Sequence, residues 1–351
     1  MRDNVFNTYT EERFMRDSNM ELLRIISMLM IVIHHFITQV NGGDTVINHS
    51  LVGGLINALC YVGVNCFILI SGWFGIRVKW KGFLNLFLCC SFFGVISYIF
   101  HIINDGDAIG SSLLKWAFLP LSGSKWWFVN CYLILYLSAP LINLALKQIS
   151  QKEYLLILGL FTLNNVYFGN IMQAEFFNQN GYSAAQMVYV YLIGGYLRRY
   201  VSKTQIRDRR WMLLTIYFVC SALWLVLKYL RLEHGIDPYF GTGYNNLFNL
   251  AGAICFFLYF SSFHFNSRIV NYIACSSFSV YLLQESIYFG RGWLYPKVGL
   301  IYESLGLGSQ IVFMLLLSVS FYILVFFIDQ PRKWIYSLLV RIIEPTKTII
   351  S

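Results

Sequence analysis

Charged residues are scarce in this chain. Only 12% of its 351 residues are Asp, Glu, Lys or Arg, whereas 57% are apolar. A soluble globular domain carries about 25% charged residues, so this chain has too little charge to cover a water-facing surface. The composition therefore argues against an ordinary soluble protein and favours one that is embedded in a lipid bilayer.

Cysteine pairs of the kind that bind metals or form redox motifs are also missing. The eight cysteines all fall within apolar segments, and no two of them form a CxxC pair. We interpret them as small core residues rather than as disulfide partners or metal ligands, and we predict no metal site and no resident cofactor. We expect no cleavable signal peptide, because the first ~18 residues are polar and the apolar stretch after them has full spanning length.

Apolar runs close to 20 residues long recur along the chain, and this length crosses a hydrocarbon core of ~30 Å. We predict an all-α, polytopic membrane protein with about ten transmembrane helices. Their predicted ranges are 21–40, 51–74, 83–103, 126–146, 153–170, 185–200, 210–230, 246–263, 269–289 and 309–329. A transmembrane domain over 21–329 would then lie between a cytoplasmic N-terminal segment (1–20) and a cytoplasmic C-terminal tail (330–351).

Basic residues fall unevenly on the two sides of these predicted helices. If the N-terminus is cytoplasmic, 19 of the 26 Lys and Arg residues lie in inside segments, six lie in outside loops, and Arg24 lies within the first helix. Cytoplasmic loops carry such an excess, so both termini are predicted to be cytoplasmic, with an even number of spans. The net charge of +9 therefore indicates a lipid bilayer as partner, with no nucleic acid.

The first predicted helix carries ionisable residues on one face. At 100° per residue, Glu21, Arg24, His35 and Gln39 fall within about 60° of one another. Arg24 and His35 are 11 positions apart, or about 16 Å along the axis. A buried Arg costs ~2.5 kcal/mol or more, so it needs a partner or a cavity, and Glu21 is the expected local partner. One alternative is that Glu21 and Arg24 simply reach the cytoplasmic interface, but that does not account for His35, which is either a packing residue or part of a site.

The second predicted helix is followed by a basic cluster. Arg77, Lys79 and Lys81 lie at its inner end, where they either fix the topology or bind the phosphates of a cytoplasmic nucleotide-containing substrate. Within the helix, four small residues allow close approach of another helix. They are Gly63, Ser71, Gly72 and Gly75.

Several segments, in order, resemble the membrane acyltransferase 3 family. The first-helix motif is matched by ELLRIISMLMIVIHHF, in which ten residues separate Arg24 from His35. Later matches are GVNCFILISGWF, KWWFVNCYLILYLSAPLIN, SSFSVYLLQES and FFIDQPRKW, which together extend over residues 20 to 335. The resemblance thus covers nearly the whole chain.

This resemblance implies a multi-pass enzyme of the bacterial inner or plasma membrane. Such a protein takes an acyl group, most often acetyl, from acyl-CoA at the cytoplasmic side. It passes the group to a sugar hydroxyl of a surface polysaccharide or of its lipid-linked precursor. By position, His35 matches the family's essential histidine and Arg24 its essential arginine. The resemblance also exposes one departure, because Gln284 stands where the family commonly has His, and Glu285 follows it.

Acyl transfer to a hydroxyl requires a base and an oxyanion donor. Histidine exchanges protons near neutral pH, so His35 is the expected base, either by direct transfer or through an acyl-histidine. The expected oxyanion donors are Asn65 or the ring N–H of Trp126 or Trp127. Arg24 with the Arg77, Lys79 and Lys81 cluster would bind acetyl-CoA or another acyl-CoA. Glu285 is either a functional neighbour or an interfacial charge, and Tyr281 and Ser277 suit helix packing equally well.

The competing interpretation is a transporter or flippase for a lipid-linked sugar, which would also contain buried Arg and His. Transporters of that kind carry helices broken by Gly or Pro at matching positions of two halves. Only six prolines occur in the chain, and no pairing of halves is visible. The sequence therefore favours the acyltransferase.

Overall fold

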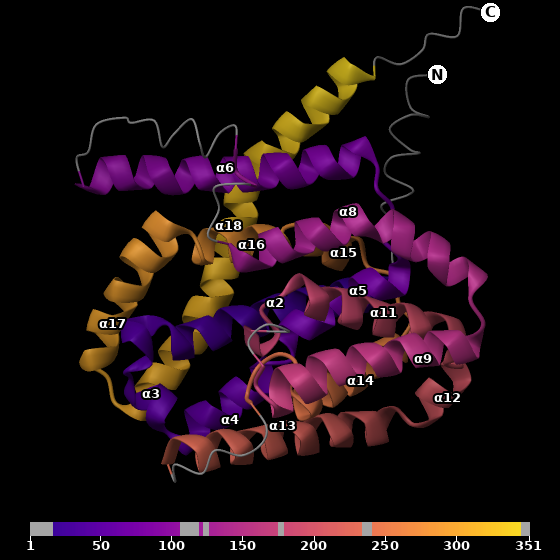
Figure 1. Ribbon diagram of the computed structural model, residues 1–351. Coiled ribbons are helices and arrows are strands. Elements are labelled where there is room, and N and C mark those ends of the chain that lie inside the picture. The colour runs from indigo at the N-terminus through magenta and orange to yellow at the C-terminus, as the bar shows by residue number, and fades with distance from the viewer. Residues whose placement is uncertain (1–16, 106–118, 122–125, 175–178, 234–240, 345–351) are drawn as a thin grey trace, which may run out of the picture.

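The computed structural model describes residues 17–105, 119–121, 126–174, 179–233 and 241–344. These residues form helices and their connections, with no strand among them. The predicted all-α fold is therefore confirmed for the described part of the chain. In Figure 1, α6, α8, α9 and α13 run alongside one another, and α18 crosses the bundle obliquely.

Seven helical segments among the described residues are long and apolar enough to cross a membrane. Four are single helices: α2 (Ser18–Thr38), α6 (Trp80–Asp105), α8 (Trp127–Gln148) and α13 (Arg210–Glu233). Two are composite: α4 (Leu51–Cys60) with α5 (Gly63–Phe74), and α9 (Gln151–Thr162) with the π-helix η2 (Leu163–Ile171). The seventh is α18 (Leu307–Ile343), which continues past the predicted domain boundary at residue 329. Such a set of helices is that of a multi-pass membrane protein.

The other three predicted spans are shorter or interrupted. They correspond to α11 (Ala184–Tyr200), to α14 (Leu247–Ser261), and to α15 (Arg268–Ala274) with α16 (Ser277–Gln284). A 15-residue helix is about 22 Å long, which is less than the hydrocarbon core. The count of ten spans therefore stays a prediction. The remaining elements are η1 (Val40–Gly43), α3 (Val46–His49), η3 (Gln179–Gly181), α12 (Lys203–Asp208), η4 (Ile287–Leu294) and α17 (Tyr295–Glu303).

The first and last described helices run in opposite directions. The backbone N–H of Ile47, just after α2, donates to Gln310 Oε1 near the start of α18 at 3.1 Å. The far end of α18 lies instead at the start of α6, where Lys81 and Glu344 form an ion pair at 2.5 Å. The start of α2 and the end of α18 therefore lie toward the same end of the bundle, while the even number of spans and the location of both termini stay predictions. The side of the membrane on which they lie stays a prediction.

Small residues bring α5 and α11 into close contact. A Cβ atom on Gly72 would lie 2.2 Å from the carbonyl oxygen of Tyr191, and one on Gly194 would lie 2.5 Å from that of Leu69. The expected close approach at Gly72 is thus present. Gly75 has a different use, because its φ of 72° ends α5 and no neighbour crowds it.

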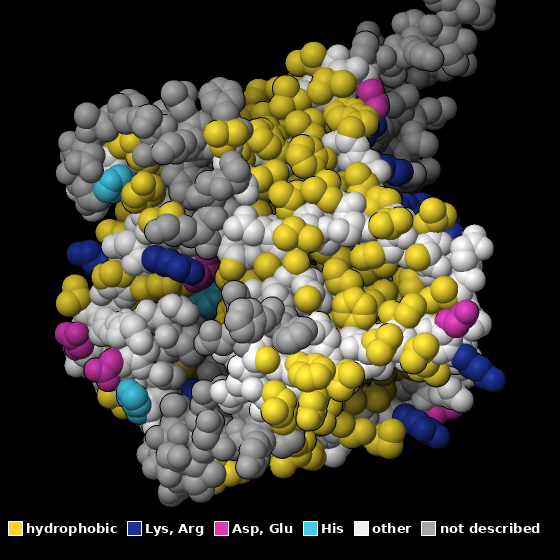
Figure 2. Space-filling model, in the orientation of Figure 1, with side chains coloured by type: hydrophobic (Ala, Val, Ile, Leu, Met, Phe, Trp, Pro, Cys, Tyr) yellow, Lys and Arg dark blue, Asp and Glu magenta, His cyan; other side chains and the backbone are white. Residues whose placement is uncertain are grey.

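Large apolar side chains cover much of the outside of the bundle. Leu141 of α8, Trp211 of α13 and Leu316 of α18 are 73%, 62% and 64% exposed. Figure 2 shows apolar side chains spread over the face it presents. In water such an apolar surface would promote aggregation, whereas in a bilayer the lipid tails contact it favourably.

Candidate active site

His35 lies inside the bundle, between α2 and the end of α16. Its side chain is buried, and its Nδ1 lies 3.1 Å from Gln284 Oε1 and 3.4 Å from Glu285 Oε1. Gln284 is the last residue of α16 and Glu285 is its C-cap residue, so the C-terminal end of α16 faces α2. Gln284, which departs from the family pattern, and Glu285, which follows it, therefore both contact the predicted base.

The amide of Gln284 fixes which nitrogen of His35 carries the proton. Its Nε2 donates to the carbonyl oxygen of Val32 at 3.1 Å, so its Oε1 must face His35. Both neighbours of Nδ1 are then acceptors, because Glu285 presents a carboxylate. From this network we assign the proton of neutral His35 to Nδ1, which leaves the lone pair on Nε2.

Glu285 is buried and is held by two further side chains. Tyr295 Oη donates to its Oε1 at 2.5 Å, and Arg291 donates to its Oε2 through Nε at 3.2 Å and Nη2 at 2.5 Å. Burying a carboxylate is costly unless such partners replace water. Arg291 lies on η4, whose tight path past α16 needs glycine, since a Cβ on Gly290 would lie 1.7 Å from the Gln284 carbonyl oxygen.

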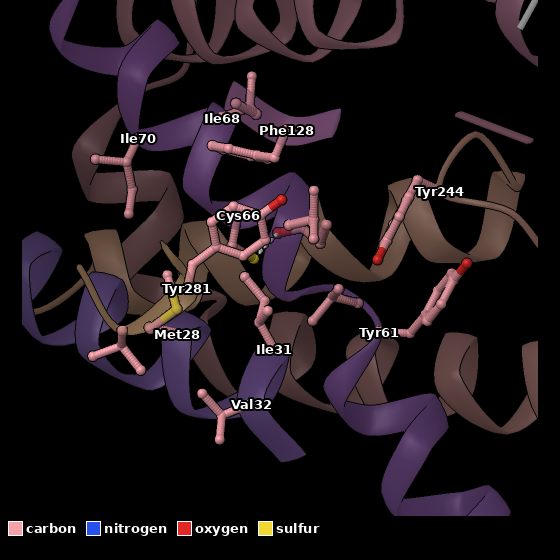
Figure 3. Close-up of a cluster of buried hydrophobic side chains, with 14 of the residues drawn as sticks. Met28, Ile31, Val32, Tyr61, Cys66, Ile68, Ile70, Phe128, Tyr244 and Tyr281 are labelled. Atoms are coloured by element: carbon pink, nitrogen blue, oxygen red, sulfur yellow. Dashed lines mark hydrogen bonds between the residues drawn. The ribbon is translucent and has the colours of Figure 1, made fainter. Parts of the chain in front are cut away.

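A narrow, mostly aromatic pocket adjoins His35, and its cavity volume is only about 10 Å³, close to the space of one water-sized sphere. Besides His35 it is lined by Met28, Ile31, Val64, Phe67, Trp127, Phe128, Tyr244, Phe278 and Tyr281. Figure 3 shows Met28, Ile31, Phe128 and Tyr281 close together, with Tyr244 to one side of them beside Tyr61. The described residues thus place a histidine with a free Nε2 lone pair beside an apolar cleft, where water competes poorly for a reacting group.

Arg24 lies toward the other end of α2 from His35. It forms an ion pair with the buried Glu21, with Arg24 Nη1 3.3 Å from Glu21 Oε2, and keeps 26% of its side chain exposed. It is also within electrostatic range of Tyr132, whose ring stacks on Phe128 with centroids 5.9 Å apart. Tyr132 and Phe128 therefore form a stacked pair of rings beside the pocket, on the side toward Arg24. Glu21 pairs with Arg24 as expected, but it stands 14 residues from His35, about 21 Å away along the helix.

A group of stacked rings borders the pocket on the side of the α8 start. Tyr244 stacks on Tyr61 and on Trp127, with centroids 4.6 and 5.7 Å apart, and Tyr182 packs edge-on at 4.9 Å. Tyr182 is 38% exposed. These rings lead from the surface to the pocket.

Buried amides hold the loop that carries Tyr244. Asn65 Nδ2 donates to the Tyr244 carbonyl oxygen and to Asn249 Oδ1, each at 2.9 Å. Both of its protons are thus in use, and its side chain positions this loop, while the oxyanion role expected for Asn65 stays a prediction. On the other side of the loop, Asn245 Nδ2 donates to the Asn165 carbonyl oxygen at 2.9 Å.

The remaining predicted residues lie away from the pocket. Trp126 is buried but does not line it, and Arg77 and Lys79 are exposed on the α5–α6 connection. Lys81 pairs with Glu344, and this hydrogen bond holds the pKa of the Glu344 carboxyl below its usual range. The structure brings together His35, Gln284, Glu285 and Trp127, and leaves the basic cluster separate.

A second buried charge network anchors α16. Asp329 of α18 accepts hydrogen bonds from Ser276 and Ser279, each at 2.9 Å, and from Arg332 Nε at 2.6 Å. Arg332 also donates to Asn85 of α6 at 2.7 Å. This network joins three helices and fixes the element that presents Gln284 and Glu285.

The sequence did not identify four residues of the pocket or of the His35 network as functional groups. They are Tyr281, Tyr295, Tyr244 and Arg291. For Tyr281 the sequence leaves a functional role and helix packing equally open, and Arg291 counts only among the basic residues of the outside loops. The one available signal was the short Glu285 to Arg291 spacing, but a single acid and base six residues apart in a loop are common. Tyrosines are too frequent here, at 24, for any one of them to stand out.

Comparison with known proteins agrees with this architecture. A family model for an acyltransferase domain matches residues 17–336. No curated protein and no solved structure matched the sequence. The match covers nearly the whole chain, so the chain belongs to the membrane acyltransferase 3 family.

Proposed function

We propose that this membrane acyltransferase moves an acyl group, most simply acetyl, from cytoplasmic acyl-CoA to a sugar hydroxyl. The acceptor is a surface polysaccharide or its lipid-linked precursor. The observation that carries the proposal is His35, whose Nδ1 contacts Gln284 and Glu285 and whose side chain lines the pocket.

His35 acts as the general base in this proposal. The acceptor hydroxyl gives its proton to Nε2 as its oxygen attacks the thioester carbon. Glu285 stabilises the imidazolium that forms, in the same way that a buried carboxylate supports the histidine of hydrolase triads. When the carbon–sulfur bond breaks, Nε2–H returns the proton to the departing CoA thiolate.

The donor enters past Arg24. Its phosphates stay with the exposed Arg77 and Lys79, and Arg24 binds the inner part of the molecule. The thin pantetheine arm spans the distance between Arg24 and His35, about 16 Å along α2. The aromatic side chains between them, Tyr132 and Phe128, form the wall of this path.

The acceptor approaches from the opposite side, across Tyr182, Trp127 and Tyr244. Apolar faces of sugar rings pack on aromatic rings, and the amide-held loop keeps Tyr244 in place for this. This route requires the predicted topology of ten spans, with both termini cytoplasmic, in the bacterial plasma membrane.

Direct transfer to the sugar and a relay through acyl-His35 use the same Nε2. In the relay Nε2 is the nucleophile, and the enzyme becomes labelled when acyl-CoA is supplied alone. We favour direct transfer, because Nδ1–H and Glu285 prepare Nε2 to accept a proton. Labelled protein recovered without acceptor, and lost on adding acceptor, would establish the relay.

The test uses membranes containing the chain, radiolabelled acetyl-CoA and the lipid-linked sugars and surface glycans of its native cell. Label should enter the glycan fraction with the wild type and fall to background with His35→Ala. His49→Ala, which changes an exposed histidine, is the matched control and should keep full labelling. No labelling by wild type, together with sugar-lipid movement across the bilayer, would support the transporter instead.

A further inference from the structure

The first turn of α8 is uncapped and opens on the pocket. Its N-cap residue, Trp126, makes no side-chain cap hydrogen bond, and the first backbone bond of the helix is Asn130 N–H to the Trp126 oxygen. The N–H groups of Trp127 and Phe128 precede that bond, so α8 leaves them unpaired. Both residues line the pocket. A helix start of this kind carries about half a positive charge.

A buried hydroxyl without an acceptor lies at the same place. Tyr281 is 5% exposed, and its phenol O–H donates to no acceptor among the described residues. It lines the pocket beside His35 and sits close to the backbone N–H of Phe128. Figure 3 shows Tyr281 and Phe128 next to each other in this cluster. An unsatisfied buried hydroxyl costs about 1–3 kcal/mol, so its retention at a reactive pocket calls for a function.

The position of Tyr281 along α16 links it to the base. It precedes Gln284 by three residues and Glu285 by four, so all three side chains lie on one side of the helix. The element that orients His35 therefore also presents the phenol. Asn65 is the amide that the sequence suggested as oxyanion donor, but both protons of its Nδ2 are donated to Tyr244 and Asn249.

We propose that the Tyr281 hydroxyl, supported by the start of α8, is the oxyanion donor of the acyl transfer. The inference rests on the proposed function and adds a catalytic group to it. The Phe128 N–H faces the phenol oxygen, and the phenol O–H is then free to point at the thioester carbonyl. The positive end of α8 favours the same negative charge.

Acyl transfer by this arrangement proceeds through a tetrahedral intermediate. The acceptor oxygen forms a bond to the thioester carbon, its proton moves to His35 Nε2, and the carbonyl electron pair moves onto oxygen. Tyr281 O–H donates a hydrogen bond to that oxyanion without transferring its proton. The carbon–sulfur bond then breaks, the carbonyl re-forms, and the thiolate takes the proton from Nε2.

Tyr281→Phe tests this inference, because it removes one oxygen and preserves the ring. The matched control is Tyr302→Phe, which removes another buried hydroxyl that has no partner among the described residues and that lies in α17, outside the pocket lining. With radiolabelled acetyl-CoA and the native glycan fraction, we expect kcat to fall about 10²–10³-fold in Tyr281→Phe. The KM for acetyl-CoA and the thermal unfolding of both variants should stay near wild type.

A second measurement distinguishes a chemical role of the Tyr281 hydroxyl from a packing role of its ring. Fluorinated tyrosines at position 281 change the acidity of the phenol with little change in size. If Tyr281 is an oxyanion donor, kcat varies steadily with the acidity of the phenol. If Tyr281 only packs, kcat does not depend on this acidity.

A Tyr281→Phe kcat within threefold of wild type, or equal to that of Tyr302→Phe, overturns the inference. So does the absence of a trend across the fluorotyrosines. In each of these cases wild-type labelling persists and the proposed function stands. Absence of wild-type labelling is the distinct outcome in which the proposed function itself fails.

Discussion

Replacing Glu285 by Gln removes the charge beside His35, and it also removes the oxygen that accepts from Arg291. Gln keeps an oxygen that accepts from His35 Nδ1, so the geometry and tautomer of the imidazole are retained. What is lost is the attraction between the carboxylate and the imidazolium, whose atoms are 3.4 Å apart. At an effective dielectric constant of 20, two unit charges at 4 Å interact by about 4 kcal/mol.

Arg291 shares this carboxylate at 2.5 Å and balances part of its field. We therefore expect about 3–4 kcal/mol to be lost from the transition state, which lowers kcat by roughly 10²–10³-fold. The change should appear in kcat and leave the KM for acetyl-CoA near wild type, because Glu285 does not lie on the donor path.

The assay is initial-rate transfer of radiolabelled acetyl groups, with Glu303→Gln as control, because Glu303 is exposed on α17. The double variant Glu285→Gln/Arg291→Gln should recover part of the loss, about tenfold, because it removes the cation left unpaired near the imidazolium. A Glu285→Gln kcat within threefold of wild type would refute the role of the carboxylate. A double variant slower than the single would refute the charge argument.

Three other changes have expected outcomes. Arg24→Gln should raise the KM for acetyl-CoA about tenfold or more with a smaller effect on kcat, measured by the same transfer assay, and an unchanged KM would remove Arg24 from the donor path. Gly290→Ala should abolish transfer and lower the free energy of unfolding by about 1–3 kcal/mol, measured by thermal unfolding, because its Cβ would overlap the Gln284 carbonyl oxygen. Normal activity of this variant would contradict the fixed geometry between α16 and η4. Asn245→Ala should loosen the loop that carries Tyr244 and raise the KM for the glycan more than that for acetyl-CoA, and equal effects on both would argue against an acceptor role for this loop.

The long apolar helices were predictable because lipid imposes length and composition directly. The predicted ranges 51–74 and 210–230 coincide closely with Leu51–Phe74 and Arg210–Leu230. The breaks inside predicted spans were not foreseeable. Cys275 and Ser276 interrupt the predicted 269–289 span without any proline or glycine, because Asp329 of a distant helix binds Ser276.

The candidate site, like the fold, was predictable only in part. Helical periodicity alone placed Arg24 and His35 on one face of α2, since that relation lies within a single element. The partners of His35 come from 249 and 250 residues later in the chain, and no local pattern joins them. The departure at Gln284 gains a physical meaning from the fold. A histidine at that position would add a second titratable ring against His35 Nδ1, whereas the amide, locked by Val32, presents a permanent acceptor. In the proposed mechanism the amide at position 284 orients His35, and Glu285 supplies the balancing charge.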